Sequence, residues 1–557
     1  MKMALFNKYK FSLNLRVIVV KMELTQMLSK VITYFLILWT VGDCADVDIG
    51  EICTNYNNKK TLLCQIPSYL NNEKDLDFYS SYTRDVDFLK FENTSISRIP
   101  NNLFYYFNYL TTLKLDYINL QSLQSTNFQQ ASYLLDLSLI GNKLHQLTSE
   151  VFVNAGHLVT LHLQKNKLKL LQQGCFNGIK NLRTLDLSGN LLSSLDENTF
   201  SEVKNLQEIN LSNNILNGLH RNIFLNNKDL RVIDLSSNDI RYIHGNTFVN
   251  LKLEKLDVSN NNFRKLSLHY VNTLIASKSG LVEISVENHG EMDELIANHN
   301  EIEKINLKTM SIKNLDLSNN RLLSLTGLMN TSLGKLDVSF NPTLKKYDFL
   351  SNFIITEHLK INSNNITDLS KVLTGSDVNN LQLERLDISN NLLSSFDFES
   401  LKRISNLQSI DISNNNLASV NYNGLKENYS FDLDRVELSG NPWNCTELKN
   451  IIKHFKANFI QLESTKDVMD DTNFYEMYVS GVGCYLNGTS KATVAPVISD
   501  EVAKQSFFME VKEILSNFEN KVKSELRAFK DEISDNKNIL SDLQMDLENL
   551  RDELQRL

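Results

Sequence analysis

The sequence predicts an α/β solenoid, a leucine-rich horseshoe of stacked repeats with one parallel β-sheet on its concave face, cysteine caps at its ends and a C-terminal α-helical coiled coil. Three observations predict it: a motif that recurs every 24 residues, cysteines at both ends of the repeated region, and heptad spacing over residues 499–557. At 557 residues the chain exceeds the roughly 250 to 300 residues at which single hydrophobic cores stop growing. A stack of repeats avoids this limit, because each repeat packs only against its neighbours.

The recurring motif combines alternating aliphatic residues with one asparagine, in the pattern L-x-L-x-x-N-x-L. Five successive copies place the asparagine at Asn142, Asn166, Asn190, Asn214 and Asn238. The asparagine returns at Asn261, Asn300, Asn320, Asn341, Asn364, Asn391, Asn415 and Asn441. Weaker copies stand upstream, around residues 89–91 and 113–115. This pattern and period define the leucine-rich repeat, which we expect over residues 86–441.

Each part of the motif has a physical role. The L-x-L segment predicts a short strand whose leucines point inward while the residue between them faces solvent. The asparagine side chain can donate to and accept from backbone groups that the following turn would leave unpaired. In five repeats a phenylalanine stands ten residues after the asparagine, which predicts an aromatic spine inside the convex side: Phe152, Phe176, Phe200, Phe224 and Phe248.

The regularity fails once, between Asn261 and Asn300. This gap of 39 residues holds either one elongated repeat or two degenerate repeats. The next two units shorten to 20 and 21 residues and lose the phenylalanine. Because solenoid shape follows from the geometry of each repeat, the shortening predicts a local change of curvature.

The N-terminal residues 1–45 predict a secretory signal. The apolar run Val31–Val41 follows Lys30, precedes small and polar residues, and is too short to span a bilayer. Met22 and Met27 are alternative initiators, so residues 1–21 are a candidate misassigned start. No later segment reaches 18 uninterrupted apolar residues, so we expect a secreted protein without a membrane span. Seven N-x-[ST] glycosylation sequons agree with this: Asn93, Asn210, Asn330, Asn365, Asn428, Asn444 and Asn487.

Cysteines mark the ends of the solenoid, where exposed apolar surface needs a cap. Cys53 and Cys64 predict a small disulfide loop in an N-terminal cap over residues 46–85. Cys175 stands before Phe176 where other repeats carry Val, Thr or Ile, so we expect a buried apolar residue. Cys44 is either removed with the signal or unpaired, and if retained it is the candidate for a bond to another chain.

The C-terminal flank, residues 442–498, starts with the run Asn441-Pro442-Trp443-x-Cys445. A helical stretch, 448–455, and Cys484 follow. This arrangement resembles the cysteine-containing C-terminal flank of extracellular leucine-rich-repeat proteins. The resemblance implies a disulfide between Cys445 and Cys484.

Residues 499–557 predict an α-helical coiled coil. Seam residues alternate at spacings of three and four, as heptads require, at Leu526, Phe529, Ile533, Asn536, Leu540, Leu543, Leu547, Leu550, Leu554 and Leu557. The alternative is a long amphipathic helix that folds back onto the repeats.

Binding rather than catalysis is the expected chemistry. The sequence contains no zinc-protease, nucleophile-elbow or phosphate-loop motif, so we expect no enzyme, metal or cofactor. A net charge of -9 disfavours nucleic acid as a partner. The solvent-facing strand residue is acidic in eight repeats, interrupted by His162 and Asn210. This row would attract a basic partner or is a general feature of the repeat: Asp186, Asp234, Asp257, Asp316, Asp337, Asp387, Asp411 and Glu437.

The combination of signal, cysteine caps, repeats and terminal coiled coil resembles the mosquito leucine-rich-repeat immune (LRIM) family, of the Anopheles Plasmodium-responsive leucine-rich-repeat protein type. The local sequence Leu295–Ile302 is similar to their repeats. The resemblance implies a haemolymph protein that pairs with another leucine-rich-repeat protein, as a hetero- or homodimer, and stabilises a complement-like thioester protein for pathogen defence. The family's adjacent cysteine pair before the coiled coil has no counterpart here, which leaves the coiled coil alone as the expected contact. Two other functions remain open, an extracellular adhesion or developmental-signalling ligand and an enzyme inhibitor.

Overall fold

The computed structural model describes residues 45–48, 53–55, 61–65, 76–79, 86–328, 331–344, 354–368, 382–422, 433–463 and 477–486. The chain divides into two compact units, 1–488 and 489–557. The signal, Cys44, the coiled-coil seam and the sequons at Asn330, Asn428 and Asn487 all lie outside the described residues. The first unit contains the repeats and the cysteines at both of their ends.

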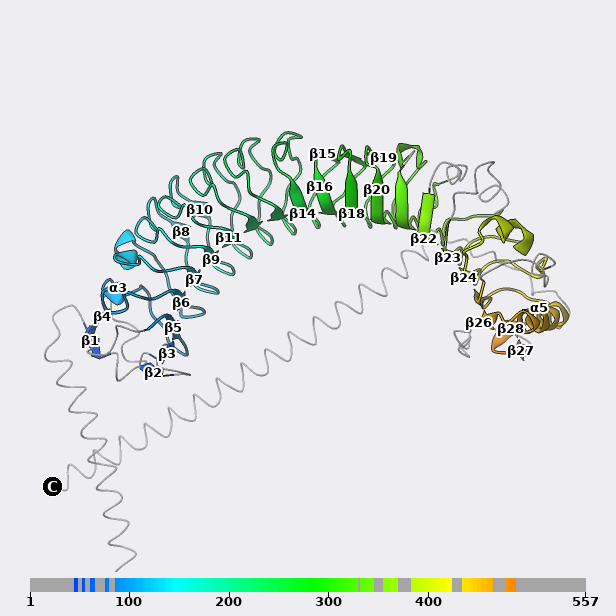
Figure 1. Cartoon of the computed structure of the whole chain (residues 1–557), viewed down its shortest axis with the longest axis horizontal. Helices are drawn as coiled ribbons and strands as arrows, with labels where there is room; N and C mark the ends of the chain where they lie inside the picture. Colours follow the sequence, from blue (N-terminus) through cyan, green and yellow to red (C-terminus); the bar gives the residue numbers. More distant parts are fainter. Residues whose placement is uncertain are drawn as a thin grey trace, which may run out of the picture. The chain divides into compact units, whose positions relative to one another are not determined.

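One long parallel sheet lines the concave side of the repeats (Figure 1). Its strands pair in chain order, and the antiparallel strand β2 (Cys53–Asn55) extends it at the N-terminal end. The parallel strands are β3 (Thr61–Cys64), β5 (Phe88–Phe91), β6 (Thr112–Lys114), β7 (Asp136–Ser138), β9 (Thr160–His162), β11 (Thr184–Asp186), β12 (Glu208–Asn210), β13 (Val232–Asp234), β14 (Leu253–Asp257), β16 (Val271–Ile275), β18 (Glu291–Ile296), β20 (Ser311–Asp316), β21 (Ser332–Asp337), β22 (Ile354–Lys360), β23 (Arg385–Asp387), β24 (Ser409–Asp411), β25 (Arg435–Glu437) and β26 (Gln461–Leu462).

The strands keep register because their aliphatic residues face the core. Leu161, Leu185 and Ile209 stand opposite one another on β9, β11 and β12, and all three are buried. Burying one such side chain contributes about 1.5–3 kcal/mol relative to leaving it exposed. The solenoid predicted from the 24-residue period is confirmed.

The recurring turn position forms a ladder of asparagine hydrogen bonds. The Asn166 amide donates to the carbonyl oxygens of Leu139, at 2.8 Å, and Leu163, at 3.0 Å, and its Oδ1 accepts from the Leu144 N–H at 3.1 Å. Leu139 and Leu144 belong to the preceding repeat. The asparagine therefore satisfies buried backbone groups as predicted, and it also joins each repeat to the one before it.

The aromatic spine is also confirmed. Ring centroids of Phe176, Phe200 and Phe224 follow one another at 5.9 Å, and Phe248 continues the stack at 6.1 Å. All of these rings are buried. The short elements on this side are α3 (Leu103–Tyr106), η2 (Ser125–Phe128), β8 (Gln146–Leu147), β10 (Leu170–Leu171), η3 (Thr326–Leu328) and η6 (Phe398–Arg403).

The irregular gap contains two short repeats, built on β16 and β18, and the first of them lacks the asparagine. Strand β16 pairs with β14 on one side and β18 on the other. Ser279 takes the asparagine position between them, and its hydroxyl donates to the Val258 carbonyl at 2.9 Å. One hydroxyl thus replaces the amide, which explains why the asparagine pattern misses this repeat.

The short repeats also change the convex side from loops to strands. Strands β15 (Lys265–Leu268), β17 (Glu283–Val286) and β19 (Lys304–Leu307) form a second parallel sheet there (Figure 1). In each strand the second and fourth residues are buried and the others are partly or fully exposed, as expected for a sheet with one face on the core.

Disulfides close both ends of the unit. Cys53 bonds to Cys64, and Cys445 bonds to Cys484. Near the N-terminal end β1 (Ala45–Asp48) pairs with β4 (Leu76–Tyr79). In the C-terminal flank Trp443 is buried and its Nε1 donates to the Leu438 carbonyl at 2.7 Å. The helix α5 (Cys445–Ala457) and the hairpin β27 (Met477–Val479) with β28 (Val482–Cys484) complete that flank.

Candidate functional site

The concave face presents two rows of side chains that point away from the core. We define the central row by strand register as Lys90, Lys114, Ser138, His162, Asp186, Asn210, Asp234, Asp257, Ile275, Ile296, Asp316, Asp337, Lys360, Asp387, Asp411 and Glu437. The flanking row lies two residues earlier in each strand. The eight predicted acidic residues stand together in the central row, but Ile275, Ile296 and Lys360 interrupt it as well as the two residues expected from the sequence.

The carboxylates of the central row also hold the turns in place. Asp186 and Asp234 each accept, through Oδ1, the backbone N–H of the serine two residues later at 2.9 Å. Glu437 does the same at 2.9 Å and is buried, so the sequence was wrong to place it facing solvent. The strand β26 and the C-terminal flank come directly after it. One oxygen of these groups therefore has a structural role, which accounts for an acidic residue in so many repeats.

Three neighbouring carboxylates, Asp387, Asp411 and Glu437, end the row. Burial raises the pKa of Asp411 from its ordinary value of 3.8 to about 6. The charges of Asp387 and Glu437 act in the same direction, while hydrogen bonds from Ser413 oppose them. Asp411 therefore releases its proton at a higher pH than an ordinary aspartate does.

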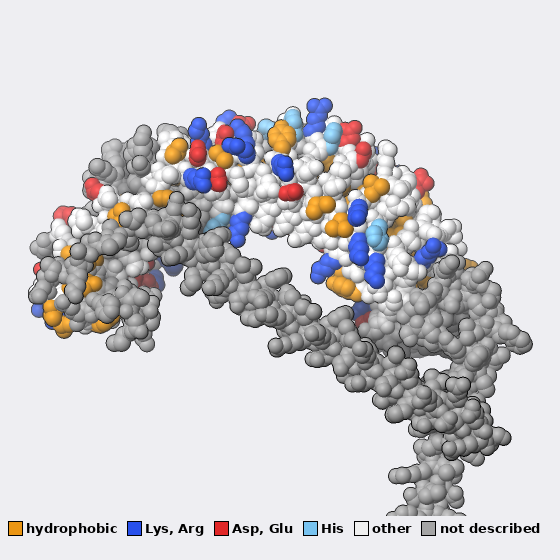
Figure 2. All heavy atoms as spheres, turned by 180° about the vertical axis from the view of Figure 1, so that it is seen from behind, with side chains coloured by type: hydrophobic (Ala, Val, Ile, Leu, Met, Phe, Trp, Pro, Cys, Tyr) orange, Lys and Arg blue, Asp and Glu red, His pale blue; other side chains and the backbone are white. Residues whose placement is uncertain are grey.

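Basic side chains balance the acidic ones over the C-terminal half of the face. Lys360 lies 3.6 Å from Asp337, and Lys335 of the flanking row lies 3.4 Å from Glu357. Exposed pairs of this kind contribute about 0–1 kcal/mol each to stability. Their effect here is on the electrostatic field: beyond β20 the central row mixes both charges, because Lys360 stands between Asp337 and Asp387 in strand register. Figure 2 shows Lys and Arg next to Asp and Glu on the side seen from behind.

An acidic hollow of about 260 Å³ lies on the concave face between β9 and β14. Its lining includes Asp186, Glu208, Asp234 and Asp257, with Lys255 as the basic member. Asn210 lies in the middle of this hollow, between Asp186 and Asp234 in strand register. A hollow with this lining favours basic or polar groups.

Beyond the hollow the central row becomes aliphatic at Ile275 and Ile296. Both side chains are partly exposed, and they stand opposite each other on neighbouring strands. Asp257 precedes them in register and Asp316 follows them. Adjacent strands lie about 4.8 Å apart, so the pair forms a small apolar patch between two carboxylates. The repeat pattern did not reveal it, because the repeat with Ile275 lacks the asparagine that marks the strand position.

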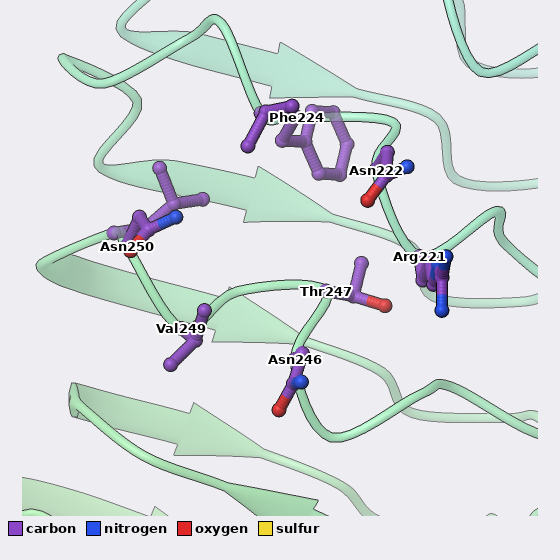
Figure 3. Close-up of a pocket in the computed structure, with 9 residues that line it drawn as sticks. Arg221, Asn222, Phe224, Asn246, Thr247, Val249 and Asn250 are labelled. Carbon is purple, nitrogen blue, oxygen red and sulfur yellow. The ribbon is translucent and has the colours of Figure 1, made fainter.

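A smaller pocket of about 190 Å³ lies between two successive loops on the convex side (Figure 3). Arg221 lies at one side, and Thr247 lines it with a buried hydroxyl that has no partner among the described residues. Equivalent positions in the preceding repeats carry Val151, Cys175, Thr199 and Ile223. Thr247 is therefore one of several residues that pack into the core at this position, and we assign no function to the pocket.

The remaining predicted residues lie apart from this face. Asn93 and Asn365 are exposed sequons, and the Asn444 side chain caps α5 by accepting from the Thr446 N–H at 2.9 Å. Cys175 is buried as predicted, and burial raises the pKa of its thiol to about 12. Within the described ranges, no three His, Cys, Asp or Glu side chains gather as a metal site would require. The helices described there are also too short or too polar to cross a bilayer.

Three family profiles match the chain. The leucine rich repeat profile matches residues 156–216 and 204–263, the BspA type leucine rich repeat region (6 copies) matches 54–170, and a further leucine rich repeat profile matches 382–404. No curated protein matches the sequence. Domains of this kind are typically non-catalytic.

Solved structures match the chain at low sequence identity. The Toll–Spatzle complex of Drosophila matches with 18% identity over 76% of this chain and 68% of that chain, with a TM-score of 0.52. The LRIM1/APL1C complex matches with 18% identity over 89% and 81%, and a TM-score of 0.49. The APL1 leucine-rich repeat domain matches with 18% identity over 76% and 97%, and a TM-score of 0.48. With the ladder, the long parallel sheet and the disulfide caps, the matched profiles lead to one conclusion: the chain is a leucine-rich-repeat protein.

Proposed function

We propose that this protein is a secreted innate-immune scaffold that binds and stabilises a complement-like thioester protein on its concave face. The observation that carries the binding role is the apolar patch of Ile275 and Ile296. Aliphatic side chains on the solvent side of a sheet have an unfavourable free energy of hydration, which a partner that covers them removes. Small desolvated patches surrounded by polar residues are where protein partners concentrate their binding energy.

The acidic and mixed rows around the patch complete the binding surface. Carboxylates on either side of the patch favour partners with basic side chains next to an aliphatic one, and charge complementarity raises the rate of encounter. The partner class comes from the resemblance of the whole sequence architecture to the LRIM family. The disulfide caps support an extracellular location, because disulfides persist in oxidising compartments. The heptad segment 499–557 would supply the contact to a second leucine-rich-repeat protein.

The first experiment measures binding of a purified complement-like thioester protein to the secreted full chain. The thioester protein should also keep its reactivity toward methylamine for longer when the chain is present. The double variant Ile275→Ser/Ile296→Ser should weaken binding by about tenfold or more, which corresponds to about 1.4 kcal/mol.

The matched control replaces two exposed aliphatic residues of the convex side, Leu225→Ser/Val249→Ser. This variant should bind as the wild type does. Equal binding by both variants would exclude the patch, and no binding or stabilisation by the wild type would exclude the thioester protein as the partner.

A further inference from the structure

Asn210 is the one member of the central row in a glycosylation sequon. Seven aspartates of the row are followed two residues later by a serine, as in Asp234-x-Ser236, and Asn210-Leu211-Ser212 has an asparagine in the same place. The other two described sequons on the solenoid repeats, Asn93 and Asn365, lie outside the strands. A sugar on Asn210 would stand within the concave sheet.

The hydrogen bonds of Asn210 fix which way its amide points. Oδ1 accepts from the Ser212 backbone N–H at 2.9 Å and from the Ser212 hydroxyl at 2.7 Å. A backbone N–H can pair only with the amide oxygen, so Nδ2 must point the other way. Nδ2 makes no hydrogen bond with the described residues, and Asn210 lines the acidic hollow of about 260 Å³.

We propose that Asn210 carries an N-linked glycan whose first sugars occupy the acidic hollow and shield Asp186 and Asp234. The Nδ2–C1 bond forms as the C1–O bond of a lipid-diphosphate-linked oligosaccharide breaks. The lipid diphosphate leaves with the electron pair, and Nδ2 loses one proton. N-linked glycans are bulky and hydrophilic, so this one keeps proteins out of the hollow. A protein partner then meets the concave face from β16 onward, at the apolar patch.

This inference depends on the proposed function in one respect, which is that the protein must be secreted. The test begins with full chain secreted from insect cells under its own leader and cut with trypsin. The peptide 205–221 contains Asn210 as its one sequon. Treatment with a peptide N-glycosidase in ¹⁸O water should convert most Asn210 to ¹⁸O-labelled aspartate, and Ser212→Ala should abolish that label. An unlabelled peptide 205–221 beside labelled Asn93 and Asn365 would overturn this inference alone. Absence of label at all three would overturn the inference as well, whereas absence of the chain from the medium would overturn secretion and with it the proposed function.

Shielding is measured separately, by carbodiimide coupling of a glycine ester to carboxylates. Asp234 should react several-fold faster in Asn210→Asp than in the glycosylated wild type, because that variant removes the sugar but keeps an oxygen to accept from Ser212. Asp387, which accepts from Ser389 N–H and hydroxyl at 3.0 and 2.7 Å, has the same geometry far from the hollow and should react equally in both. Equal rates at Asp234 would overturn the shielding.

Discussion

The side-chain oxygen of Asn166 accepts a hydrogen bond from the backbone N–H of Leu144, 22 residues earlier in the chain, at 3.1 Å. The same contact recurs at 3.0 Å between Asn190 and Leu168 in the next repeat. Each repeat thus supplies a hydrogen-bond partner for a backbone N–H group of the preceding repeat. Stability should therefore depend on these amides far more than on asparagines at the surface.

Replacing Asn166 by alanine should lower the free energy of unfolding by about 3 kcal/mol, because it leaves the Leu144 N–H buried without a partner. The measurement is the shift of the thermal unfolding midpoint. Asn205→Ala is the matched control, since the exposed Asn205 donates one bond, to Lys180 O at 3.0 Å. It should cost about 1 kcal/mol or less. Equal shifts would contradict the ladder.

Asp411→Asn should stabilise the protein at neutral pH. Folding raises the pKa of Asp411 from 3.8 to about 6, so the folded state binds the proton more tightly than the unfolded state. The contribution of Asp411 to the free energy of unfolding is therefore largest below pH 4. It decreases as the pH rises through 6, by about 3 kcal/mol in total. Asparagine keeps the acceptor and removes the charge. The gain should appear at pH 7.5 and vanish at pH 4, and a gain of equal size at both would contradict the assignment. The variant must come from cells without N-glycosylation, because it creates Asn-x-Ser.

Cys175 should resist thiol reagents in the folded protein, because burial raises its pKa to about 12 and excludes the reagent. Its labelling rate should match the rate of unfolding. Cys175→Val should be tolerated, since Val151 fills the same position one repeat earlier. Cys175→Ser would bury a hydroxyl and should cost about 1–3 kcal/mol. Fast labelling without unfolding would show that this position opens.

Removing the Cys445–Cys484 disulfide should cost more than removing Cys53–Cys64. The two bonds join residues 39 and 11 apart. Loop-closure entropy gives about 4 and about 3 kcal/mol, because the longer loop restricts the unfolded chain more. Two double Cys→Ser variants, one for each disulfide, test this by their free energies of unfolding in denaturant. A larger decrease for the N-terminal pair than for the C-terminal pair would contradict the prediction.

The 24-residue period predicted the strands, the ladder and the phenylalanine spine, because residues at equivalent positions of successive repeats make equivalent contacts. It could not place Ile275, since Ser279 replaces the asparagine and no phenylalanine follows, whereas Ile296 precedes Asn300 at the same spacing as Asp316 precedes Asn320. The aliphatic spacing of Val271, Leu274 and Ala276 was the available signal. The period also aligned the acidic residues in one row, but it did not show that Glu437 is buried or that basic residues of neighbouring strands stand beside the row. Sequence periodicity does not show those contacts.

The most direct test of the concave face as the binding surface is an engineered glycan on it. Asp337→Asn creates a sequon with Ser339, two strands beyond Ile296, and Asp337 already accepts from the Ser339 N–H at 3.0 Å. The control Asp337→Asn/Ser339→Ala has the same change of charge and no sugar. With binding of the thioester protein as the readout, the glycosylated variant should lose affinity by about tenfold or more while the control binds as the wild type does. Unchanged binding by the glycosylated variant would contradict the proposal that the partner docks on this face.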